Sequence, residues 1–194
     1  MAQKNQNPQL DYKITVFGMG TVGKSCMLIQ FIHGYFETEY DPTIEDNYKK
    51  AVKVNDRTIM LHLFDTAGQD NVKALVDRYV NLSDGFLLVY AVNEVMSFEK
   101  IEEFYDTIVQ VKGEGEKNIV LCGNKCDLKE QRQVSTKEGE EFAQFMKASF
   151  FETSALTGQN VENAFVEIAK MIYNKREKNA SKPPEPPRRR CVLL

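Results

Sequence analysis

Eight residues near the N-terminus have the types and spacing of a phosphate-binding loop. The pattern is Gly18-x-x-x-x-Gly23-Lys24-Ser25, directly after the apolar run 14–17. Glycines let backbone N–H groups converge on an anion, and a helix that begins near Lys24 points its positive end at the same place. The lysine adds a charge for the β- and γ-phosphates, and the serine hydroxyl suits Mg²⁺. The alternative is a glycine-rich turn that binds nothing, which the complete spacing between a predicted strand and a predicted helix disfavours.

A second motif, Asn124-Lys125-x-Asp127, follows a predicted strand at 118–123. Parallel strands present ligands at their carboxyl ends, so this motif can reach the phosphate loop. The Asp127 carboxylate can accept hydrogen bonds from guanine N1–H and from its exocyclic amine, a pair that adenine does not offer. Charged hydrogen bonds contribute about 1.5–3 kcal/mol each. The phosphate loop alone fits ATPases, GTPases and small-molecule kinases, and this motif favours guanine nucleotides. An ordinary polar loop after a buried strand is the alternative.

A third segment, LFDTAGQD, could serve a metal ion and a water molecule. Asp65 ends a predicted strand, where an acid supports Mg²⁺ in phosphate-loop enzymes. Gly68 can bring a backbone N–H to a γ-phosphate, and Gln69 can orient an attacking water. Thr43, between the first helix and the second strand, could be a further Mg²⁺ ligand.

The elements that must position these motifs alternate between strand-like and helix-like segments. Strands are predicted at 12–17, 48–54, 58–64, 85–91, 118–123 and 149–153. Helices are predicted at 24–33, 73–81, 94–112, 136–147 and 159–174. A short polar turn at 54–58 joins the second and third strands as a hairpin, and helices separate the others. The pattern predicts an α/β fold with a six-stranded, mostly parallel sheet, one antiparallel edge, and five helices on both faces.

Taken in order, the segments GMGTVGKS, YDPTIEDNY, DTAGQ, NKCD and TSAL resemble those of a Ras-family small GTPase. The resemblance covers roughly residues 11–174 and the last four residues. It implies a GTP-binding domain over 11–174 that holds GTP or GDP with Mg²⁺ and slowly hydrolyses GTP to GDP and phosphate. It also implies signalling through effectors bound by the GTP form. YDPTIEDNY is similar to the effector segment of Ras proper, and Gln69 fits Ras better than Rap.

The resemblance implies a role for individual residues. GTP contacts are implied for Gly18, Met19, Gly20, Thr21, Val22, Gly23, Lys24, Ser25, Cys26, Phe36, Tyr40, Pro42, Thr43, Asp65, Thr66, Ala67, Gly68, Asn124, Lys125, Asp127, Leu128, Ser154, Ala155 and Leu156. Direct Mg²⁺ ligands are implied at Ser25 and Thr43, with Asp65 acting through water. Catalytic roles are implied for Lys24, Thr43, Gly68 and Gln69. An effector surface is implied for Tyr40, Asp41, Pro42, Thr43, Ile44, Glu45, Asp46, Asn47 and Tyr48.

Some positions depart from the Ras pattern. Thr21 stands where Ras has glycine, and Leu156 replaces the lysine of Ser-Ala-Lys, as in Rho-type sequences. Asn71 and Val72 stand where Ras usually carries Glu and Tyr. That last surface meets exchange factors and activating proteins, so the identity of these partners does not carry over.

Two rival functions use the same motifs. One is a binding module locked in a single nucleotide state, which Gln69 argues against. The other is a phosphate-loop kinase, which would prefer ATP and carry an arginine-rich lid. Residues 34–50 contain no arginine, so the domain supplies none beside Thr43 and its own hydrolysis should be slow. Five acids between 37 and 46 predict effectors with basic surfaces, against the simpler reading of a solvated acidic face.

The two ends of the chain read as disordered, over the polar residues 1–10 and the charged, proline-rich residues 175–194. The final CVLL fits a prenylation box at Cys191, with its terminal leucine favouring geranylgeranyl, followed by methylation. Seven basic and two acidic residues between 175 and 190 suit an anionic membrane. PPEPP is expected to be a stiff spacer rather than a Pro-x-x-Pro ligand.

Composition argues against several other classes of protein. The net charge of −3 disfavours a nucleic-acid partner, and no apolar run approaches the roughly 20 residues of a membrane helix. The polar N-terminus lacks a signal core, and the four cysteines do not form a disulfide framework. Cys122 and Cys126 have a ligand-like spacing, but no second pair completes a zinc site. We expect a monomer anchored by lipid to the cytoplasmic face of a membrane, with the plasma membrane as the first candidate.

Overall fold

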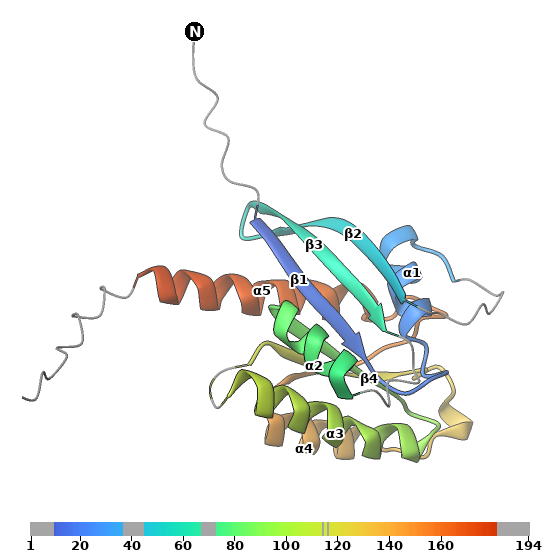
Figure 1. The fold of residues 1–194 in the computed structure, drawn as a ribbon. Helices are drawn as coiled ribbons and strands as arrows, with labels where there is room; N and C mark the ends of the chain where they lie inside the picture. The colour runs from blue at the N-terminus through green and yellow to red at the C-terminus, as the bar shows by residue number, and fades with distance from the viewer. Residues whose placement is uncertain (1–9, 37–44, 67–72, 114, 116, 182–194) are drawn as a thin grey trace, which may run out of the picture.

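Six strands form a single sheet in the order β2-β3-β1-β4-β5-β6 (Figure 1). The structure is a computed structural model that describes residues 10–36, 45–66, 73–113, 115 and 117–181. The strands are β1 (Leu10–Phe17), β2 (Glu45–Val54), β3 (Arg57–Thr66), β4 (Gly85–Ala91), β5 (Ile119–Asn124) and β6 (Ser149–Glu152). Neighbouring strands run parallel except β2 and β3 at one edge. This confirms the predicted fold class.

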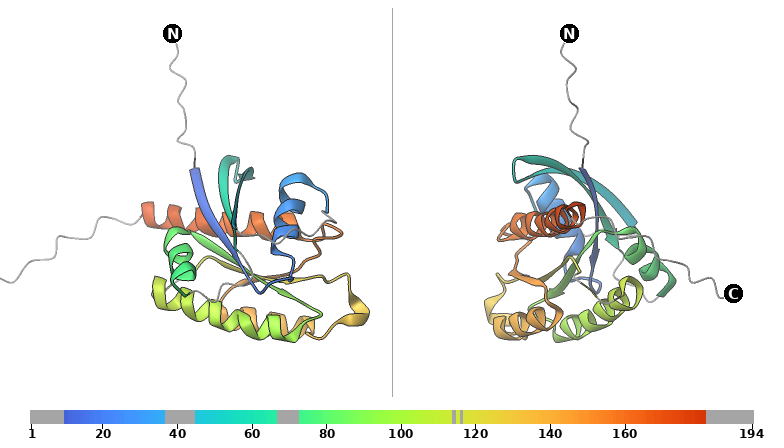
Figure 2. Two further views of the ribbon diagram at one scale, coloured as in Figure 1. Left: turned by 45° about the vertical axis from the view of Figure 1, so that its right-hand side comes forward. Right: turned by 90° about the vertical axis from the view of Figure 1, so that its left-hand side faces the viewer.

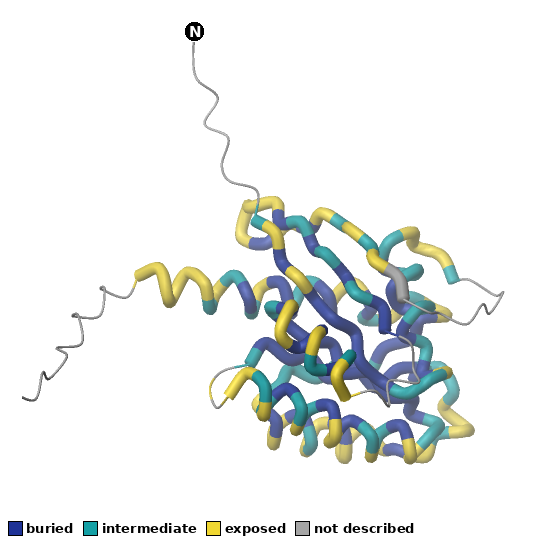
Figure 3. The backbone as a smooth tube through the Cα atoms, in the orientation of Figure 1, coloured by how far each residue is buried: buried dark blue, intermediate teal, exposed yellow. Residues whose placement is uncertain are grey.

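Helices cover both faces of the sheet (Figure 2). They are α1 (Lys24–His33), α2 (Lys73–Leu82), α3 (Val95–Lys112), α4 (Thr136–Met146) and α5 (Val161–Ala180), with a single 3₁₀ turn, η1 (Lys129–Gln131). Helices α1 and α5 pack on one face, and α2, α3 and α4 pack on the other. Because a parallel sheet is covered on both sides, a central strand such as β4 carries no charged residue. All seven residues of β4 are buried (Figure 3).

A two-residue turn closes the β2–β3 hairpin, as the polar stretch predicts. Asn55 and Asp56 have positive φ values of 46° and 61°, and Val54 pairs with Arg57. Two left-handed residues make a turn whose twist matches that of the flanking strands. Strand β2 begins at Glu45 rather than at residue 48, which places the last part of the predicted effector segment, 45–48, on the sheet edge. The register sets Asp46 opposite Asp65.

Helix α5 is longer than the periodicity predicts. It continues through Ala180, so the residues from Lys175 to that point belong to the helix, and the predicted start of the disordered tail at 175 is corrected for them. Arg176 fixes this extension: its Nη2 donates to Asp84 Oδ1 at 2.8 Å, and its guanidinium lies 4.5 Å from the centre of the Tyr12 ring. At the other end of the chain, Leu10 belongs to β1 rather than to the predicted arm.

Candidate nucleotide-binding site

The loop between β1 and α1 can be built only with glycine at two positions. A Cβ on Gly18 would lie 2.1 Å from the carbonyl oxygen of Val89 in β4. Gly23 has φ +94°, and a Cβ there would lie 2.6 Å from the side-chain nitrogen of Asn124. The first and last glycines of the motif therefore let the loop pass closely against β4 and against the loop after β5.

Lys24 is the first residue of α1, and its ammonium group turns back into the phosphate loop. The residue is only 6% exposed. Its Nζ donates to the carbonyl oxygens of Gly18 and Met19, at 2.9 and 3.0 Å. The N-terminus of α1 faces the same loop, with Gly23 as its N-cap. The loop therefore gathers a fixed cation and the N-terminus of a helix, the combination that binds phosphate.

Thr21 keeps a left-handed backbone although it is not glycine. Its φ is 64°, a conformation that costs a β-branched residue on the order of 1–3 kcal/mol. The Thr21 side chain is exposed, while Val22 beside it is fully buried. The surrounding contacts fix the path of this loop, so the departure from the glycine of Ras leaves the loop shape in place.

Asn124, at the end of β5, joins three loops through its side-chain amide. Its Nδ2 donates to the Val22 carbonyl oxygen of the phosphate loop at 2.8 Å. Its Oδ1 accepts from the Thr153 hydroxyl at 3.2 Å and from the Ala155 N–H at 3.1 Å. One buried side chain therefore holds the phosphate loop, the loop after β5 and the loop after β6 in a fixed relation.

The Asp127 carboxylate is held beside the loop that follows β6. Its Oδ1 accepts from the Ser154 hydroxyl at 2.5 Å. The Cys126 N–H donates to the Thr153 carbonyl oxygen at 3.0 Å, which adds a backbone link between the same two loops. Lys125, between Asn124 and Cys126 in the sequence, has a left-handed backbone with φ 64°. The acid predicted to read guanine is thus fixed at one oxygen and retains further acceptor capacity, because an ionised carboxylate accepts about four hydrogen bonds.

The predicted metal-supporting acid lies at the same edge of the sheet. Asp65, near the end of β3, is fully buried and is paired in register with Val16, just before the phosphate loop. The neighbouring Thr66 hydroxyl donates to the Val16 carbonyl oxygen at 2.8 Å. Ser25, in the first turn of α1, completes a set of oxygen donors, which is the chemistry that Mg²⁺ prefers. The described residues hold no cluster of three His, Cys, Asp or Glu.

Other predicted residues lie around this edge or outside the described residues. Phe36 is half-buried against the core beneath α1 and α5, and Leu156 is 55% exposed. The predicted residues outside the described ranges are Tyr40, Asp41, Pro42, Thr43, Ile44, Ala67, Gly68, Gln69, Asn71, Val72 and Cys191. The structure therefore brings together the phosphate loop, Asp65 and the two loops predicted to contact the base.

Three supporting residues escaped the sequence interpretation. Thr153 is fully buried and positions Asn124, and its place just before Ser154 in TSAL was the available signal. Arg132 forms a bidentate pair with Glu152, Nη1 to Oε1 at 2.6 Å and Nη2 to Oε2 at 3.1 Å. Hydrogen bonding to Glu152 raises the pKa of the Arg132 guanidinium above its usual value. The pair holds the segment after Asp127 against β6. No pattern in the sequence predicts this ion pair.

Comparison with known proteins agrees with this geometry. A sequence model of the Ras family matches residues 13–174. A Ras-like protein of Laccaria bicolor is 44% identical over 173 residues, covering 88% of this chain and 83% of that protein. The fold and its loops define a phosphate-loop nucleotide-binding protein. The chain belongs to the Ras family of small GTPases, which bind GTP and GDP and hydrolyse GTP.

Replacing Asn124 with alanine is expected to loosen nucleotide binding and to destabilise the fold. The change leaves the Val22 carbonyl and the Ala155 N–H without their partner, and a buried unsatisfied group costs about 1–3 kcal/mol. We expect faster GDP release by about tenfold or more, measured with a fluorescent GDP, and a lower midpoint of thermal unfolding. Asn118→Ala is the matched control, since this buried asparagine bonds the Asp84 carbonyl at the far end of the sheet. GDP release at the wild-type rate in N124A would contradict the assigned role.

Proposed function

We propose that this protein is a Ras-type molecular switch. It binds GTP or GDP with Mg²⁺, hydrolyses GTP slowly, and engages effectors at a membrane while GTP is bound. The observation that carries the proposal is the Asn124 side chain, which fastens the phosphate loop to both loops predicted to contact the base. Phosphate recognition and base recognition are thereby coupled in one rigid frame.

In this proposal Mg²⁺ is held by the Ser25 and Thr43 hydroxyls, with Asp65 acting through a water molecule. A bound Mg²⁺ would neutralise charge on the β- and γ-phosphates. The buried position of Asp65 supports this assignment, because a carboxylate in that environment favours a neighbouring cation. Removing Mg²⁺ would weaken nucleotide retention.

The chain provides most of the charge that hydrolysis requires, but not all of it. Lys24 supplies a fixed cation, and Gln69 would orient the attacking water. Residues 34–50 contain no arginine, so charge that develops toward the leaving diphosphate is incompletely neutralised. An activating protein that inserts an arginine would complete the site. Slow intrinsic turnover makes the bound nucleotide a lasting signal.

The effector surface would be the free edge of β2. This strand is the outermost of the sheet and pairs only with β3 among the described strands. Glu45 and Asp46 begin it, and three further acids lie between 37 and 41. Acidic residues at an exposed edge suit a basic partner that adds a strand. Loss of the γ-phosphate would release the contacts of Thr43 and Gly68 and alter this surface.

The decisive test is a single-turnover measurement of phosphate release from bound GTP, with and without an arginine-bearing activating protein. Slow release that the activator accelerates would support the switch. Tight GTP binding without release in either condition would instead indicate the locked binding module. Preference for ATP over GTP would contradict the proposal altogether.

Membrane attachment would depend on geranylgeranylation of Cys191, assisted by Arg188, Arg189 and Arg190. One lipid chain gives only reversible binding, so the basic residues form the second signal. No helix among the described residues has the length and apolarity to cross a bilayer.

We expect Cys191→Ser to move the protein from the membrane fraction to the soluble fraction of cells, measured by fractionation and blotting. Cys26→Ser is a suitable control, since it removes a thiol without touching the prenylation box. Undiminished membrane recovery of C191S would refute the lipid anchor.

A further inference from the structure

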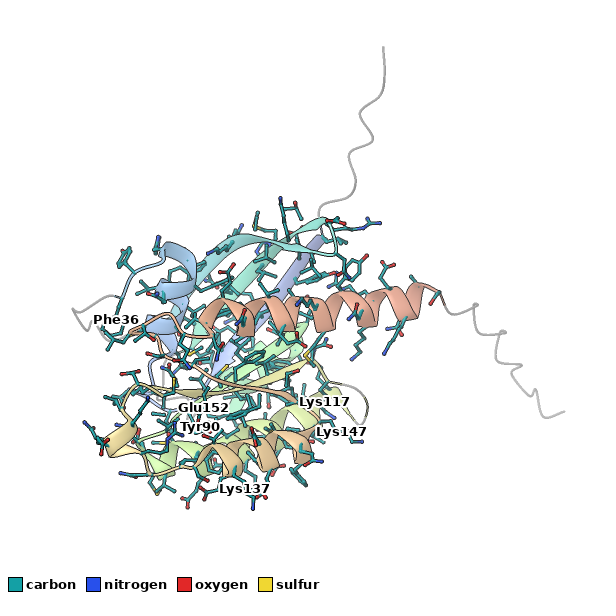
Figure 4. The ribbon with its side chains drawn as sticks, turned by 180° about the vertical axis from the view of Figure 1, so that it is seen from behind. Phe36, Tyr90, Lys117, Lys137, Lys147 and Glu152 are labelled. Atoms are coloured by element: carbon teal, nitrogen blue, oxygen red, sulfur yellow. The ribbon has the colours of Figure 1, made fainter. Side chains whose placement is uncertain are left out.

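A cavity of about 440 Å³ opens at the end of the sheet opposite the phosphate loop. Its wall is formed by the start of β4, the loop before β5, and the C-terminal parts of α3 and α5. This volume lies within the range of about 300–1,000 Å³ that is usual for small-molecule sites. Lys117, in the loop between α3 and β5, is labelled in Figure 4. The nucleotide site proposed above uses none of these residues.

Cationic side chains dominate the described lining of this cavity. Lys112, Lys117, Lys175 and Arg176 face a single described carboxylate, that of Asp84. This carboxylate is already engaged at both oxygens. Its Oδ1 accepts from Arg176 at 2.8 Å, and its Oδ2 accepts from a backbone N–H of β1 at 2.9 Å. The Asp84 carboxylate is therefore already engaged by Arg176 and β1, and the charges of Lys112 and Lys117 leave the cavity electropositive.

Lys112 and Lys117 both retain hydrogen-bonding capacity. The Nζ of Lys112 donates to the Asn81 carbonyl oxygen at 3.2 Å, and that of Lys117 donates to the Gly115 carbonyl oxygen at 3.2 Å. An ammonium group has three donors, and within the described chain neither lysine forms an ion pair. Burial lowers the pKa of Lys112, Asp84 opposes that shift and Lys175 adds to it. An anion beside Lys112 would relieve its repulsion by Lys175.

The apolar residues of the cavity narrow the class of anion. Phe86 and Ile172 line the cavity beside the lysines and are almost fully buried. A ring with an apolar face and several phosphate groups matches such a floor and rim better than a small inorganic anion does. We propose that this cavity binds the phosphorylated inositol headgroup of an anionic membrane lipid.

The direction of the chain favours a lipid rather than a free metabolite as the source of this headgroup. Arg176 and Asn179 of α5 line the cavity, and the helix ends at Ala180. Cys191 follows eleven residues later, a distance of at most about 40 Å in an extended chain. A lipid anchor at that position keeps the cavity within reach of the membrane surface. This step rests on the membrane attachment proposed above, whereas the charge and shape of the cavity do not.

The first experiment titrates the full-length, unlipidated, GDP-bound protein with soluble inositol trisphosphate and follows backbone amide resonances. We expect shifts at Gly113, Gly115, Asn118 and Asn179. The double variant Lys112→Gln/Lys117→Gln should lower the affinity by about tenfold or more, since each charged hydrogen bond contributes about 1.5–3 kcal/mol. The matched control is Lys49→Gln/Lys137→Gln, which removes the same charge on β2 and in the first turn of α4 (Lys137 is labelled in Figure 4), away from the residues that line the cavity, and should bind as the wild type does.

The outcomes separate this proposal from its alternatives. Equal loss in both double variants would reduce the effect to general charge attraction and overturn the proposal. The absence of shifts in the wild type would also overturn the proposal. Inorganic phosphate that binds as tightly as inositol trisphosphate would also overturn it.

The second experiment distinguishes lipid from soluble ligand with vesicles. At equal surface charge, vesicles containing a phosphorylated inositol lipid should retain more protein than vesicles containing phosphatidylserine, and K112Q/K117Q should abolish only this difference. Equal retention on both vesicles would overturn the lipid assignment. GDP release and GTP hydrolysis should stay unchanged in both double variants, so failure of the proposed switch function would be visible separately.

Discussion

Replacing Asp127 with asparagine should lower the affinity for GTP and GDP by roughly two or more powers of ten, since two charged hydrogen bonds are lost. It should raise the affinity for xanthine nucleotides at the same time. The carboxylate is predicted to accept from guanine N1–H and the exocyclic amine, whereas an amide can donate to the C2 carbonyl of xanthine. The Ser154 hydroxyl, 2.5 Å from Asp127 Oδ1, can still donate to an asparagine oxygen, so the loop should keep its position.

The measurement is displacement of a fluorescent nucleotide by GDP and by xanthosine diphosphate, for the wild type and for D127N. Glu130→Gln is a fitting control because it removes one negative charge from the exposed η1 turn, close in sequence to the same loop. D127N should unfold at nearly the same temperature as the wild type. If D127N prefers guanine as strongly as the wild type does, another group reads the base.

The site was predictable to the extent that its residues lie in short motifs at strand ends. The phosphate loop, Asp65 and Asn124 each follow a strand with a clear apolar pattern, and parallel strands bring their carboxyl ends to one edge. The alternation of strands and helices along the sequence then made the mostly parallel sheet predictable. Asn124 is the last residue of the fully buried strand β5, and its amide reaches the phosphate loop from this edge of the sheet.

Other features depend on contacts between distant segments and leave no local pattern. The extension of α5 is fixed by Arg176 against Asp84 and Tyr12, which precede it by 92 and 164 residues in the sequence. The Arg132–Glu152 pair likewise joins segments that no periodicity relates. Strand β2 starts early because pairing with β3 continues to Glu45, although the acidic residues there have low strand propensity.

Replacing Gln69 with leucine should leave GTP and GDP binding unchanged and nearly abolish hydrolysis stimulated by an activating protein. Leucine cannot orient the attacking water, and without that water a supplied arginine has no nucleophile to assist. In small GTPases the activating protein adds a factor of about 10⁵ to the hydrolysis rate, and most of that factor should be lost. Phosphate release from preloaded GTP, in single-turnover conditions with a catalytic arginine donor, measures the effect.

Gln131→Leu is the matched control for this experiment, because it makes the same exchange at an exposed position of the η1 turn. Q131L should respond to the activating protein as the wild type does. If Q69L responds equally, the water is positioned by another group. If Q69L loses GTP binding, its slow hydrolysis would reflect a damaged site rather than a missing contact to water. Intact affinity combined with lost stimulation is the outcome that assigns Gln69 to the chemical step, since only an interaction made in the transition state lowers the rate without weakening the ground-state complex.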